Sequence, residues 1–115
     1  AVTPSSSSSK FLVMCSVGGV RKDSSNTSVG IRLTSAISGG SSYDYDGIKE
    51  AGYTVNSNTN TIQVGFTHFF THSHSGNAIT FTMKFNSAQN TNSARVKVNS
   101  EQAEIVIVEF VSSDQ

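Results

Sequence analysis

The sequence predicts an all-β protein built as a β-sandwich or jelly roll. Several short segments alternate apolar and polar residues, which is typical of strands with one buried face. The segments between them are rich in Gly, Asn and Ser, which supply the backbone conformations of turns. Helical patterning is almost absent, and the best candidate, residues 46–51, is short and ends at Gly52. Short strands separated by such turns indicate a sandwich or jelly roll, and the 115 residues form a single domain, 1–115.

The first expected strand, residues 11–17 (FLVMCSV), is apolar on both faces. One face carries Phe11, Val13, Cys15 and Val17, and the other carries Leu12 and Met14. We interpret Cys15 as a small buried apolar side chain, because its neighbours give it no electropositive setting. It is the only cysteine, so no intrachain disulfide can form.

Three further segments, residues 29–34, 62–67 and 79–85, alternate in the manner of half-buried strands. Residues 38–47 (SGGSSYDYDG) have turn composition and are expected to form a loop. The sequence FTHFFTHSH, residues 66–74, indicates a strand that runs into a turn. His68 is in phase with the apolar residues of this strand, so its side chain is expected to point inward.

A shorter strand over 94–98 and a final one over 104–111 complete the expected sheets. The final segment, EIVIVEFV, is apolar on both faces, as is FLVMCSV. One face of such a strand packs on the opposing sheet, but no helix is available to cover the other. A neighbouring subunit is the natural cover, which favours a symmetric oligomer, while coverage by surface loops is the alternative.

Composition excludes several classes of partner. The formal net charge is +0 and 14% of the residues are charged, against about 25% in ordinary domains. A nucleic-acid partner is not expected, because the sequence shows no basic face. Membrane insertion is not expected either, because no segment approaches the roughly 20 apolar residues of a membrane helix. The chain begins with Ala1 and not Met, so we expect a longer parent protein, to which the Ser-rich residues 1–9 connect.

Catalytic signatures are missing from the sequence, so we expect no enzyme, no catalytic residue and no cofactor. The serines lie in low-complexity turns, and there is no G-x-S-x-G elbow. Asp44 and Asp46 are two residues apart and would project to one side of an extended chain. A glycosidase pair or a Ca²⁺ contact is an alternative for them, but an ordinary polar loop is the simpler interpretation.

The hexapeptide THSHSG, residues 71–76, raises the question of a metal. His72 and His74 could face the same way on an extended chain, but catalytic zinc needs three protein ligands. In a trimer, six such imidazoles around the axis could coordinate a transition metal. The pair borders an apparent Gly-Asn turn, so we expect a polar turn and no metal, with receptor contact and an axial metal as the alternatives.

The polar loops could instead bind a receptor or a sugar. An exposed tyrosine ring can stack on a sugar while an aspartate accepts hydrogen bonds from its hydroxyls. The candidate binding residues are Tyr43, Asp44, Tyr45 and Asp46, with His72 and His74. Tyr53 belongs to the same region, and all three tyrosines suit strand packing equally well.

Two phrases at the ends of the chain carry a family resemblance. The opening TPSSSSSKFLVM and the final EIVIVEF, with VGIRLT and GNAITFTMKF between them, resemble the C-terminal heads of bacteriophage tail-fibre and related virion proteins. The resemblance implies a jelly roll similar to tumour-necrosis-factor and complement-type heads, assembled as a homotrimer. It also implies a non-enzymatic, virion-located head that binds a host-cell receptor or surface glycan. The alternatives are a capsid-decoration or fibre-trimerisation module, and a cellular carbohydrate-binding module.

Overall fold

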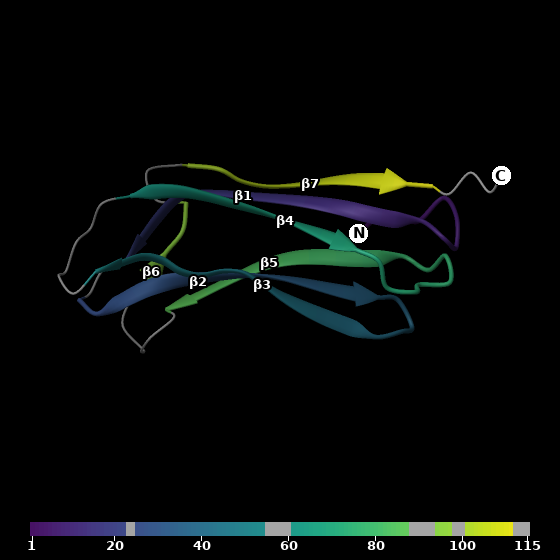
Figure 1. Cartoon of the computed structure of the whole chain (residues 1–115), viewed down its shortest axis with the longest axis horizontal. Helices are drawn as coiled ribbons and strands as arrows, with labels where there is room; N and C mark the ends of the chain where they lie inside the picture. Colours follow the sequence, from purple (N-terminus) through teal and green to yellow (C-terminus); the bar gives the residue numbers. More distant parts are fainter. Residues whose placement is uncertain (23–24, 55–60, 88–93, 98–100, 112–115) are drawn as a thin grey trace.

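The computed structural model of the chain is all-β, with two antiparallel sheets arranged as two layers, as expected for a β-sandwich (Figure 1). It describes residues 1–22, 25–54, 61–87, 94–97 and 101–111. The molecule is elongated, with extents of 56 × 23 × 22 Å along its principal axes. Within the described ranges there is no helix that is long and apolar enough to cross a membrane.

The first layer, called here the β1 sheet, is organised around the long strand β1 (Lys10–Lys22). Strand β4 (Ile62–Phe70) pairs with one edge of β1, so that Leu12 lies opposite Phe69. Strand β7 (Ala103–Phe110) pairs with the other edge, where Leu12 lies opposite Val108. The short strand β6 (Ala94–Arg95) continues this second edge at the end of β1.

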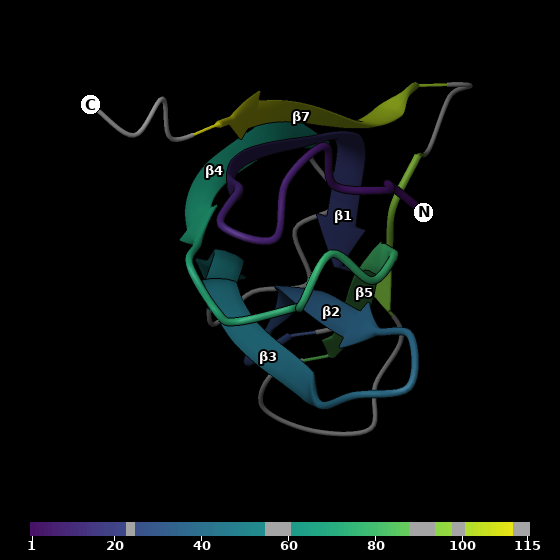
Figure 2. The same ribbon diagram turned by 90° about the vertical axis from the view of Figure 1, so that its right-hand side faces the viewer.

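The second layer, called the β2 sheet, has the order β3-β2-β5. Its strands are β2 (Thr27–Ile37), β3 (Ser42–Thr54) and β5 (Ile79–Ser87). Strands β3 and β4 lie side by side where the two sheets meet (Figure 2). The four strands from β2 to β5 therefore follow the spatial order β5-β2-β3-β4, which is the Greek-key order found in most sandwiches.

The core lies between the sheets, where the inward side chains of both layers meet in two adjoining clusters. The first cluster is built from Phe11, Val13, Cys15, Leu33, Ile37, Phe70 and Ile79. The second is built from Val17, Val20, Val29, Ile31 and Ala51. Phe66 and Met83 pack against both clusters and connect them. Cys15 is buried as expected, and burial raises the pKa of its thiol to about 11.

Residues 1–9, which we call the N-terminal strap, connect the two sheets on the side away from β3 and β4. Val2 exchanges two backbone hydrogen bonds with Ile79 of β5, at 2.8 and 2.9 Å. Ser5 donates its backbone N–H and its hydroxyl to the carboxylate of Glu109 on β7, at 2.7 and 3.0 Å. The strap therefore ties the free edge of one sheet to the free edge of the other.

One expectation for the middle of the chain was wrong. Residues 38–47 are not one loop, since only the turn before Ser42 is irregular, and residues 46–51 are not helical. Both stretches belong largely to β3, which pairs with β2 along its length. Strand pairing with a well-ordered neighbour outweighs the weak strand preference of Asp, Ser and Gly. Of the expected strand 94–98, residues 94–95 form β6, and Val98 lies outside the described residues, as does the turn 56–60.

Candidate functional site

Strand β3 distributes the predicted binding residues over two opposite faces of the β2 sheet. Tyr43 and Tyr45 pair with Ser35 and Leu33, whose side chains are buried between the sheets. Asp44 and Asp46, which alternate with the tyrosines, point the other way, to the outer face. The four residues of YDYD therefore form two separate sites, because successive side chains of a strand alternate.

On the outer face, Arg32 of β2 gathers both aspartates. Its Nε donates a hydrogen bond to Oδ1 of Asp46 at 2.8 Å, and its Nη1 lies 3.6 Å from Oδ2 of Asp44. The hydrogen bond and charge of Asp46, followed by the charge of Asp44, raise the pKa of Arg32. All three side chains are about half exposed, so water and salt screen these ion pairs and they add little to stability.

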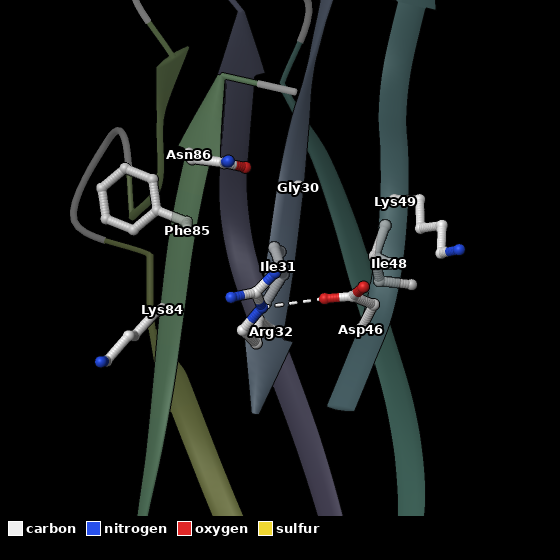
Figure 3. A pocket seen from close by; sticks show the side chains of 9 residues that line it. All are labelled: Gly30, Ile31, Arg32, Asp46, Ile48, Lys49, Lys84, Phe85 and Asn86. Atoms are coloured by element: carbon white, nitrogen blue, oxygen red, sulfur yellow. Dashed lines mark hydrogen bonds and ion pairs between the residues drawn. The ribbon is translucent and has the colours of Figure 1, made fainter. Parts of the chain in front are cut away.

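Beside this ion pair the outer face of the β2 sheet is hollowed, with a volume of about 490 Å³. The lining residues are Gly30, Ile31, Arg32, Asp46, Ile48, Lys49, Lys84, Phe85 and Asn86 (Figure 3). Gly30 has no side chain to fill the space, and the β2–β3 register shifts on both sides of Ile31. We call this depression the β2-sheet hollow.

The tyrosines stack on histidines at the junction of β3 and β4. The ring of Tyr43 lies parallel to that of His72, with 3.6 Å between ring centroids and an angle of 4°. Tyr45 stacks on His68 with centroids 4.3 Å apart. Burial, followed by the charge of His72, lowers the pKa of His68. We call these four residues the tyrosine–histidine corner, and their stacking joins the two sheets.

His74 is buried and holds the N-terminal strap. The backbone N–H of Gly76 donates to Nδ1 of His74 at 3.0 Å, so the ring proton is on Nε2. Nε2 then donates to the carbonyl oxygen of Ser9 at 2.8 Å. With both nitrogens in hydrogen bonds, a metal would have to displace one of them. In the part of the chain that the structure describes, no three His, Cys, Asp or Glu side chains are grouped as metal ligands.

The outer face of the β1 sheet is apolar, as the doubly apolar strands predicted. Its members are Leu12, Met14, Phe69, Val106, Val108 and Phe110. Phe69 and Phe110 are 48% and 49% exposed and contact each other edge to face, with centroids 5.7 Å apart. Exposed apolar patches of this kind mark interaction sites. We call this surface the apolar face.

Sequence reasoning missed Phe69 as a member of the apolar face, and it missed the β2-sheet hollow entirely. The signal for the hollow was present in the alternation of VGIRLT, which places Gly30 and Arg32 on the same outward face. The partners of these residues, Lys49, Lys84 and Asn86, come from strands whose pairing the sequence does not reveal.

Comparison with known proteins gave no relative: no protein-family model, no curated protein and no solved structure matches this chain.

Proposed function

We propose that this chain is the non-enzymatic receptor-binding head of a bacteriophage tail fibre or a similar virion appendage. The observation that carries the proposal is the contrast between the two outer faces of the sandwich. The β1 sheet presents the apolar face, whereas the β2 sheet presents charged side chains around a hollow. A head that assembles through one face and binds through the other needs this arrangement.

The apolar face supports assembly as a homotrimer around a threefold axis. Its side chains come from all three neighbouring strands β4, β1 and β7, so they form one continuous surface and not scattered exposed residues. Burial of apolar surface stabilises an interface by about 25 cal/mol per Å², so docking of a second copy of the same chain on this face is favourable. The Greek-key order and the pairing of the first strand with the last support a jelly roll of the tumour-necrosis-factor type.

Attachment in this proposal depends on avidity. Three weak sites on one rigid head raise the overall affinity without any new contact. The receptor contacts are the outward Asp44 and Asp46 beside the hollow, with the exposed edges of Tyr45 and His72 at the corner as a second contact area. His74 is excluded from receptor contact in this arrangement, because it is 3% exposed and holds the strap.

The test is a cell-attachment assay with fluorescently labelled head on a panel of bacterial strains, with and without enzymatic removal of surface polysaccharide. We expect saturable labelling of at least one strain. A Val108→Glu variant, which places a charge on the apolar face, should label the same strain at least tenfold more weakly, because it loses avidity.

Absence of labelling on every strain, with the trimer intact, would contradict the proposal. A trimer that binds no cell but binds capsids would instead support a capsid-decoration or fibre-trimerisation module.

A further inference from the structure

We infer that the β2-sheet hollow binds a sugar that carries a carboxylate, such as a uronic or sialic acid residue of a surface glycan. The inference rests on the proposed function and names the ligand class of that head. It starts from the charges that line the hollow, which are three cations, Arg32, Lys49 and Lys84, against one carboxylate, Asp46. Asp44 pairs with Arg32 beside the hollow, so three cations face two carboxylates there, in a chain whose formal net charge is +0.

The three cations come from three neighbouring strands, Arg32 from β2, Lys49 from β3 and Lys84 from β5, and both lysine side chains point away from Arg32 (Figure 3). Arg32 is the central residue of a cross-strand row, opposite Lys84 on β5 and Asp46 on β3. Its Nε and Nη1 face the aspartates, and within the described residues its Nη2 has no partner, which leaves N–H donors for a ligand. Lys84 and Lys49 lie on the two flanks of Arg32 (Figure 3) and are exposed. Neither forms an ion pair with any residue in the described ranges.

The other lining groups favour a sugar over a simple anion. The side-chain amide of Asn86 offers hydrogen-bond donors and an acceptor. Oδ2 of Asp46, the oxygen that does not accept from Arg32 Nε, can accept a hydrogen bond from a hydroxyl. Phe85 also lies on the β5 side of the hollow and is 50% exposed, with its ring pointing away from Arg32 (Figure 3). Gly30 lines the hollow without a side chain, and the volume of about 490 Å³ lies within the range of sites that hold small ligands.

Two neighbouring features argue against other ligands. Asp44 and Asp46 would repel a continuous polyanion such as a nucleic acid, which needs several neutralised phosphates for affinity. The tyrosine–histidine corner offers less to a sugar, because Tyr43 and Tyr45 already use one ring face each on His72 and His68.

The experiment is a titration of the ¹⁵N-labelled protein, followed by NMR, with glucuronate, galacturonate and N-acetylneuraminate. Glucose, galactose and acetate serve as matched probes that lack either the carboxylate or the sugar ring. We expect at least one acidic sugar to shift the amides of Gly30 and Asn86 saturably at millimolar concentration. We expect the affinity to fall as NaCl is raised, because salt screens exposed charges.

The variant Lys84→Gln should weaken this binding at least fivefold. Lys97→Gln removes the same charge from an exposed turn outside the hollow and should leave it unchanged. Any of four results would overturn the inference. These are equal shifts from neutral sugars, equal affinity for acetate, no binding of any acidic sugar, and an affinity for the acidic sugar that Lys84→Gln does not change. The titration and the attachment assay can fail independently. If the protein labels cells but binds no acidic sugar, the proposed function stands and the inference about its ligand is wrong.

Discussion

At the scale of single residues, Gly47 shows how closely the two sheets approach at β3 and β4. A Cβ atom at this position would lie 2.3 Å from Cδ2 of Phe66, far inside the van der Waals distance. Phe66 packs against both core clusters, so its ring cannot move aside without disturbing contacts in both. Gly47 is therefore required by packing and not by a turn.

Replacement of Gly47 by Ala should lower the free energy of unfolding by about 1–3 kcal/mol, because the added methyl overpacks the junction. Urea unfolding monitored by circular dichroism measures this change. Thr82→Ala, on the exposed outer face of β5, is the control and should change stability by less than about 0.5 kcal/mol. A Gly47→Ala protein as stable as the parent would show that Phe66 is not confined.

His68 gives stability a dependence on pH near neutrality. Its pKa is lowered from 6.5 in the fold, so its stabilising contribution is complete above pH 6.5 and is lost as the pH falls through the lowered value. The variant His68→Phe keeps a ring against Tyr45 but does not titrate. Between pH 7.5 and 5.5 the melting temperature should therefore fall further in the parent protein than in the variant. Parallel curves for the two proteins would refute the role of His68.

At the scale of elements, the N-terminal strap is held by a carboxylate whose titration can be followed. The Ser9 hydroxyl, followed by the backbone N–H and the hydroxyl of Ser5, lowers the pKa of Glu109 from 4.5. The stabilisation is therefore complete above pH 4.5 and is lost as the pH falls through the lowered value.

Glu109→Gln should remove this acid sensitivity and should speed hydrogen exchange of the Ile79 amide, which donates to Val2 in the strap. Exchange measured by NMR at pH 6.5 reports the opening of the strap directly. Glu104→Gln, an exposed change on the outer face of the same strand, is the control and should leave Ile79 protected. Unchanged protection in Glu109→Gln would mean that the strap is held by other contacts.

The elements also show what the sequence could predict. Strands β2, β4 and β5 were anticipated because their inward apolar residues alternate with polar ones, and β1 and β7 were anticipated because they are short runs of β-branched and other apolar residues. Strand β3 was missed, although YDYDG does alternate, because its inward tyrosines were interpreted as exposed and its aspartates as loop residues. The residues of the site come together through strand register. Arg32 lies opposite Asp46 and Lys84 because β3 and β5 pair with β2 at those positions, and the composition of the chain does not predict this pairing.

At the scale of the whole molecule, the apolar face predicts the oligomeric state. Light scattering of the purified domain at micromolar concentration should give the mass of three 12.2 kDa chains. Val108→Glu should give monomers, because three carboxylates would have to be buried in an apolar interface. Thr82→Glu, on the opposite outer face, should leave the trimer intact. A monomeric parent protein would contradict the proposed assembly.

The pairing of β1 with β7 also constrains how the chain acquires its structure. Ser5 and Glu109 are 104 positions apart, and the β1–β7 ladder joins segments almost as distant, from Lys10 opposite Phe110 to Val17 opposite Ala103. Such non-local contacts require the loss of loop-closure entropy before their favourable energy is gained. Folding should therefore take milliseconds to seconds. During synthesis the β2–β3 hairpin can form while β1 still has an open edge. When copies of this chain emerge close together, that edge can accept the β7 of another copy, and exchange of this strand between copies is the assembly error to expect.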